Sequence, residues 1–151
     1  MKKTLVILLT LVMIISSVFS VPVSALSANK VTETTIEYLE NGDYIETILT
    51  YEDSLTRSTK TASKTKNYKN ASTGATLWSV TVNCTFSYNG SVSACTSVSH
   101  SAKSYSSSWT IKSVSSDRAG NTGTAYATAA YNSRNYTMSV SLSCSTYGEL
   151  S

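Results

Sequence analysis

The stretch TLWSVTVNCTFSYNG, residues 76–90, decides the fold. From Trp78 to Tyr88 every second residue is apolar, and the residues between them are Ser, Thr or Asn. An alternation of period two is typical of a β-strand that buries one face. Asn89-Gly90, at the end of the stretch, is a strong turn signal. The stretch therefore predicts a long strand that reverses direction near residue 90.

The remainder of residues 64–151 continues this pattern of short alternating runs between turn-forming residues. Several short strands at regular spacing are typical of a β-sandwich or barrel. We therefore predict an all-β fold, an immunoglobulin-like β-sandwich of about six strands. The expected strands are Lys64–Asn70, Thr76–Tyr88, Val92–Ser101, Ser107–Ser115, Thr122–Tyr131 and Tyr136–Ser145.

The register of the hairpin around residue 90 follows from which face is buried. A two-residue turn would pair Cys84 with Cys95, but it would turn Val92 and Val98 away from the face that carries Trp78. A three-residue turn over 89–91 keeps both valines on that face. We therefore expect the three-residue turn, with Cys84 and Cys95 on opposite faces.

The first residues have the three parts of a secretory signal peptide. Lys2 and Lys3 precede an apolar run, 5–18, and small residues follow at Val23 and Ala25. The run is shorter than the roughly 20 residues that span a bilayer. We expect residues 1–25 to be a signal peptide cleaved after Ala25, with a secreted product and no stable membrane insertion.

Charge divides the rest of the chain into two parts. Residues 26–53 hold seven acidic residues against Lys30 alone, whereas 54–151 hold nine basic residues against Asp117 and Glu149. We interpret 26–51 as an acidic β-hairpin that turns at Asn41-Gly42, 52–63 as a linker and 64–151 as the sandwich domain. A two-residue turn would place glutamates opposite each other, which is unfavourable.

Such a hairpin needs a partner surface, and we expect it to dock on the basic stretch 64–69. Its apolar side chains would provide the contact, with charge setting the orientation. Two interpretations remain open: two solvated surfaces, or a pro-segment removed near Arg57. The apolar positions in question are Ile36, Tyr38, Ile45 and Ile48.

Several segments resemble a family of small exported proteins of Gram-positive bacteria, over roughly residues 60–151. The segments are TLWSVTVNCTFSYNG at 76–90, CTS at 95–97, SSW at 107–109, AGN at 119–121 and SLSCS at 141–145. The resemblance implies a β fold and a Cys95–Cys144 disulfide, and the family has no established function or active site. Cys84 stands where that pattern usually has Gly, so it is either the odd thiol or displaces a usual partner.

Catalytic and metal-binding patterns are missing from the sequence. His100 has serine neighbours, but no nucleophile elbow accompanies it. One His and three Cys without CxxC spacing make no zinc site, and no calcium loop is present. The nearly balanced charge of the mature chain gives no general attraction to nucleic acid. We predict that the chain is not an enzyme and has no cofactor, metal or nucleic-acid partner.

Tyrosine is the remaining feature, with 10 residues against 2 Phe. Tyrosines beside Ser and Asn make adaptable contact surfaces, whereas Trp78 and Trp109 are assigned to the core. We predict a secreted, non-catalytic binding module whose partner is an extracellular protein or glycan. The alternative is a secreted antagonist, a toxin or enzyme inhibitor with an acidic pro-segment. The candidate contact residues are Tyr68, Tyr105, Tyr126, Tyr131, Tyr136 and Tyr147.

Overall fold

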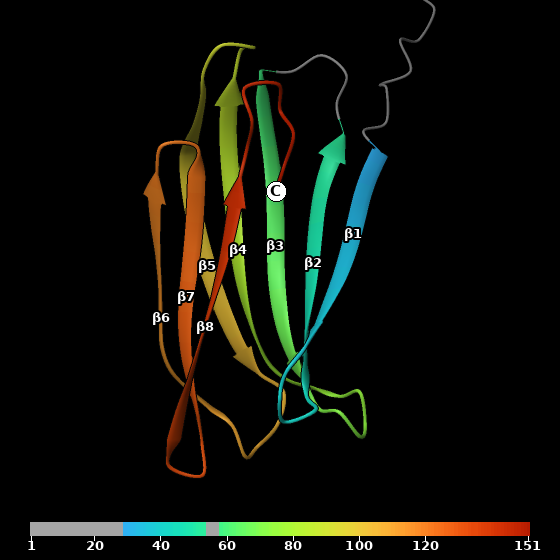
Figure 1. The fold of residues 1–151 in the computed structure, drawn as a ribbon. Coiled ribbons are helices and arrows are strands. Elements are labelled where there is room, and N and C mark those ends of the chain that lie inside the picture. Colours follow the sequence, from blue (N-terminus) through green and yellow to red (C-terminus); the bar gives the residue numbers. More distant parts are fainter. Residues whose placement is uncertain (1–28, 54–57) are drawn as a thin grey trace, which may run out of the picture.

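The computed structural model describes residues 29–53 and 58–151. The predicted signal peptide and Arg57 lie outside these described residues. Within them the chain forms eight antiparallel strands in two sheets and no helix (Figure 1). The all-β prediction is therefore confirmed, with eight strands rather than about six.

Each sheet consists of strands that are consecutive in the sequence. One sheet has the order β1-β2-β3-β4-β5 and the other β6-β7-β8. An immunoglobulin domain instead mixes early and late strands in each sheet, so that finer arrangement is not confirmed. The bounds are β1 Asn29–Tyr38, β2 Tyr44–Asp53, β3 Thr59–Lys69, β4 Thr76–Tyr88, β5 Ser93–Ser104, β6 Thr110–Ala119, β7 Thr122–Tyr131 and β8 Arg134–Ser143.

The core lies between β4 and the strands β7 and β8 of the second sheet. The alternating apolar residues of β4 from Trp78 to Phe86 are at most 1% exposed, as the sequence pattern predicts, and Tyr88 at the end of the strand is partly buried. Because alanines on β7 have small side chains, the backbone of β7 lies close to that of β4. Larger side chains of β8 fill the space beside these alanines. The facing residues are Trp78, Val80, Val82, Cys84 and Phe86 of β4, Ala125, Ala127 and Ala129 of β7, and Met138, Val140 and Leu142 of β8.

The first hairpin has a three-residue turn, so the predicted two-residue turn is wrong. Tyr38 pairs with Tyr44, and the Leu39 amide donates to the Asp43 carbonyl at 2.8 Å. Gly42 has φ +88°, a conformation that glycine adopts readily and that closes a turn with one extra residue. Because the register moves by one residue, Glu37 faces Ile45 and the expected repulsion between glutamates does not arise.

The hairpin is part of the larger sheet. Strand β2 pairs with β3 from Tyr44–Lys69 to Tyr51–Ala62, and residues 59–63, assigned to the linker, are strand. The hairpin is therefore attached to β3 by backbone pairing as well as by side chains. Ile36 and Tyr38, which were expected to contribute apolar contact, are exposed. Charge contributes one ion pair among the described residues, between Lys69 Nζ and Glu46 Oε1 at 3.0 Å.

The β4–β5 hairpin differs from the expected three-residue turn. Tyr88 pairs with Ser93, and a register shift beside Phe86 leaves Thr96 outside the ladder. The bulge adds Thr96 to β5. The side chain of the residue before it, Cys95, therefore points into the core. Cys95 is buried on the same face as Cys84. The expectation that these cysteines point to opposite faces is therefore wrong.

Candidate binding site

Four connections meet at one end of the sandwich, because consecutive antiparallel strands alternate in direction. They join β1 to β2, β3 to β4, β5 to β6 and β7 to β8, at the lower end of Figure 1. We call this the turn end. Its connections are 39–43, 70–75, 105–109 and 132–133.

Five aromatic side chains pack together at the turn end, and we call them the aromatic cluster. Trp109 lies at the centre of the cluster. Its ring centroid is 5.1 Å from that of Tyr131, to which the ring is nearly parallel, and 4.9 Å from that of Tyr136. Its ring also lies 5.4 Å from Tyr68 and 6.1 Å from Trp78. These distances are in the range in which aromatic pairs attract each other beyond simple burial. The cluster therefore joins both sheets and fixes the rings in place.

Asp43 ties the first hairpin turn to this cluster. Its Oδ2 accepts hydrogen bonds from Tyr68 Oη and Asn41 Nδ2, both at 3.0 Å. Its Oδ1 accepts from the Ala71 amide at 2.9 Å, which joins the first turn to the next one. Both carboxylate oxygens are thus used within the protein.

Two cavities flank the cluster. One has a volume of about 550 Å³ and lies against β2, β3, β4 and β8, and the other has about 320 Å³ and reaches the β5–β6 loop. Both fall within the roughly 300–1,000 Å³ of small-molecule sites. Asn41, Tyr68 and Tyr136 line both cavities, so the two hollows share a wall.

The electrostatic character of these cavities is neutral to acidic. Their lining residues include Glu40 and Asp43 but no Lys or Arg. Burial, together with the neighbouring Asp43 carboxylate, raises the pKa of Tyr68 above its ordinary value. The Tyr68 hydroxyl therefore stays protonated and donates to Asp43 throughout the neutral range.

The structure brings three of the six candidate tyrosines together: Tyr68, Tyr131 and Tyr136. Tyr105 lies on the β5–β6 loop at the same end, 54% exposed, with Lys103 Nζ 4.8 Å from its ring centre. Tyr126 is exposed on β7 away from the core, and Tyr147 follows Thr146, whose carbonyl accepts from the Gly90 amide of the β4–β5 turn at the opposite end.

Sequence reasoning missed the polar residues of the site. It used Asn41 only as a turn signal and Asp43 only as a charge, although both contact Tyr68. Trp78 and Trp109 are buried as predicted, but they also line the cavities. The available signal was the alternation of strand directions, which sends every second connection to the same end.

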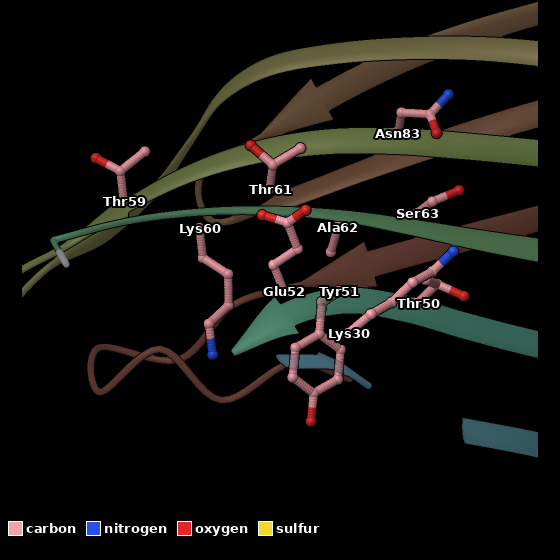
Figure 2. A pocket seen from close by; sticks show the side chains of 10 residues that line it. All are labelled: Lys30, Thr50, Tyr51, Glu52, Thr59, Lys60, Thr61, Ala62, Ser63 and Asn83. Carbon is pink, nitrogen blue, oxygen red and sulfur yellow. The ribbon is translucent and has the colours of Figure 1, made fainter. Parts of the chain in front are cut away.

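A third cavity, of about 400 Å³, lies near the other end between β2 and β3. Figure 2 shows that Thr59 and Thr61 extend to one side of the sheet and Lys60 to the other. Lys60 Nζ donates to the Gly148 carbonyl at 2.8 Å, so this lysine binds the C-terminal segment of the chain. The lining side chains do not converge on one point, which makes this cavity a weaker candidate.

Other chemistry is sparse in the described part of the chain. His100 Nδ1 lies 2.7 Å from Ser116 Oγ, and both belong to the surface strands β5 and β6. The Asp117 carboxylate accepts from the Arg118 amide. Among residues 29–53 and 58–151, no group of three or more His, Cys, Asp or Glu could hold a metal ion. Nor does this part contain a helix long and apolar enough to cross a bilayer.

Comparison of the chain with family models, curated proteins and solved structures found no match.

Proposed function

We propose that the protein is a non-catalytic binding module that acts outside the cell or at the cell wall. The observation that carries this proposal is the aromatic cluster between two cavities at the turn end. Rigid aromatic rings with amide and hydroxyl neighbours give contact area at a low entropic cost. The turn end also gathers loops on a rigid scaffold, which is where binding residues are commonly placed.

The antagonist alternative requires release of the acidic hairpin. Strand β2 pairs with β3 along eight residue pairs, and Glu46 of β2 is bound to Lys69 and Asn67 of β3. These contacts favour a hairpin that remains in place, and they therefore favour the binding module.

The test uses protein purified from culture medium and immobilised. It is incubated with cell walls, soluble glycans and extracellular proteins, and retained material is identified. We expect retention that is lost in Tyr131→Ala and kept in Tyr126→Ala, because both tyrosines are exposed but only Tyr131 belongs to the cluster. Retention that is equal in both variants would contradict a site at the turn end.

A further inference from the structure

The lining of the two turn-end cavities narrows the chemical class of the ligand. Three properties matter: which rings are accessible, which polar groups are unused and which charges are present. Each can be assigned from the described contacts.

The accessible rings are those of Tyr131 and Tyr136. Tyr131 is 37% exposed and Tyr136 is half-buried, whereas Tyr68 and Trp109 are each 7% exposed. Trp109 stacks against Tyr131 with an interplanar angle of 15°, which holds that ring in one orientation. Tyr131 and Tyr136 therefore form a fixed aromatic surface, on which the flat, C–H-bearing face of a ligand can stack.

Apart from the Glu40 carboxylate of the larger cavity, the unused polar side chains of the lining are neutral. The Asn135 side chain, on the wall of the larger cavity, and the Ser108 hydroxyl, on the wall of the smaller one, take part in no hydrogen bond within the described residues. An amide provides both donors and an acceptor, and a hydroxyl provides one donor and two acceptor sites. Ligand hydroxyl and acetamido groups match these partners.

Charge excludes other ligand classes. No cation lines either cavity, so phosphate, sulfate and uronic acid groups find no counter-charge. Both oxygens of Asp43 already accept hydrogen bonds, so this carboxylate is not free to bind a basic peptide. Glu40, at an exposed position, is the remaining carboxylate of the lining.

We propose that the turn end binds an uncharged saccharide in the smaller cavity, with a sugar ring against Tyr131 and Tyr136 and its hydroxyl or acetamido groups hydrogen-bonded to Ser108. This inference rests on the proposed function and specifies the ligand.

The experiment measures binding by calorimetry with chitohexaose, cellohexaose and mannohexaose as neutral probes and polygalacturonate as an anionic probe. We expect at least one neutral probe to bind and polygalacturonate not to bind. Tyr131→Ala and Ser108→Ala should each weaken binding about tenfold, the equivalent of one stacking contact or hydrogen bond. Tyr126→Ala is the matched control and should bind as the unmodified protein does.

The outcomes separate this inference from the proposed function. If no neutral saccharide binds while an extracellular protein is retained through Tyr131, the saccharide assignment is wrong and the binding module stands. If neither is retained, both proposals fail. Tighter binding of polygalacturonate than of the neutral probes would also overturn the assignment.

A second, independent observation concerns the buried cysteines at the opposite end. A Cβ atom on Gly123 would lie 2.4 Å from Cys84 Sγ and 3.3 Å from Cys95 Sγ, so both sulfurs meet over the same backbone position. Cys95 Sγ donates to the Ser97 carbonyl at 3.3 Å, and Cys144 Sγ donates to the Ser145 carbonyl at 3.5 Å. Burial and the neighbouring Cys95 raise the pKa of Cys84 to about 12.

We infer that, after export, Cys84 and Cys95 form the disulfide and Cys144 stays a buried thiol. The two thiols lose two protons and two electrons to an acceptor disulfide, which is reduced to two thiols as the Cys84–Cys95 bond forms. The Cys95–Cys144 pair, which the family resemblance implies, is the competing outcome.

Tryptic mapping distinguishes the two pairs. Cys84 and Cys95 lie together on the peptide 70–103, and Cys144 lies on 135–151. After oxidation with oxidised glutathione and alkylation without reduction, we expect peptide 70–103 to be two hydrogens lighter and 135–151 to be alkylated. Cys144→Ser should keep this result and Cys84→Ser should abolish it. Linked peptides 70–103 and 135–151, or full alkylation of all three cysteines, would overturn the inference.

Discussion

The two ends of the sandwich are built from the same strands, yet they fill the space between the sheets differently. At the turn end five aromatic rings meet, and cavities of about 550 and 320 Å³ remain beside them. At the other end small residues interlock, and Gly123 leaves no room for a Cβ atom beside Cys84. Large flat rings held at fixed angles leave gaps, whereas small residues allow the sheets to close. The space between the two sheets can therefore be hollow at one end and tightly packed at the other, while the third cavity, of about 400 Å³, is lined by the larger sheet alone.

The largest expected effect is the loss of the ring at the centre of the cluster. Trp109→Ala should lower the free energy of unfolding by about 3–5 kcal/mol, because it removes a buried ring that contacts four others. Urea unfolding measures this, with Tyr126→Ala as the exposed control. A loss below about 1 kcal/mol would mean that the cluster does not hold the two sheets together.

The tightly packed end is tested by adding one methyl group. Gly123→Ala should destabilise the reduced protein by about 2–3 kcal/mol, because its Cβ would overlap Cys84 Sγ. In a Cys84→Ala background the same change should cost less, since the overlapping atom is gone. Equal costs in both backgrounds would show that the two positions do not interact.

The link between the turns depends on Asp43. Asp43→Ala should cost about 2 kcal/mol, because the Tyr68 hydroxyl and the Ala71 amide both lose a charged acceptor. Asp117→Ala is the matched control, since within the described part of the chain that carboxylate accepts only from the adjacent Arg118 amide. Similar losses in thermal unfolding for the two variants would contradict a structural role for Asp43.

Trp78 should tolerate the loss of its indole nitrogen. Its Nε1 is buried and has no hydrogen-bond partner among residues 29–53 and 58–151, so Trp78→Phe removes an unsatisfied donor together with some packing. We expect a net loss below about 1.5 kcal/mol, against about 3–5 kcal/mol for Trp78→Ala. Equal losses in the two variants, measured by urea unfolding, would show that the indole nitrogen has a partner.

The smallest effect concerns the ion pair between the hairpin and β3. A hydrogen bond from Lys69 lowers the pKa of Glu46 in the folded protein. This contribution is present above the unfolded pKa of about 4.5 and is lost as pH falls through the lower folded pKa. Because the pair is partly exposed, its worth is about 0.2–1 kcal/mol. Glu46→Gln should reduce the acid sensitivity of unfolding by this small amount, with Glu149→Gln as control.

Local pattern predicted the strands well and their registers less well. The bounds of β4 and β7 match the alternation of Thr76–Tyr88 and Thr122–Tyr131. The register of the first hairpin was wrong by one residue, and that of the β4–β5 hairpin by one residue near its turn and two beyond its bulge. The reason is that turn residues permit several loop lengths and a bulge can change the direction of a side chain. The polar stretch 59–63 looked like a linker because its strand character comes from pairing with β2 and β4.

The sequence by itself determined the all-β class, the buried face of β4 and the abundance of tyrosine, because these follow from periodicity and composition. Only the tertiary structure decided which aromatic residues meet. Tyr68 and Tyr136 are far apart in the chain, yet their rings lie 6.4 Å apart, whereas Tyr126 is left outside the cluster. Strand order, register and the packing of one sheet on the other set these distances, and none of them is a property of a local stretch of sequence.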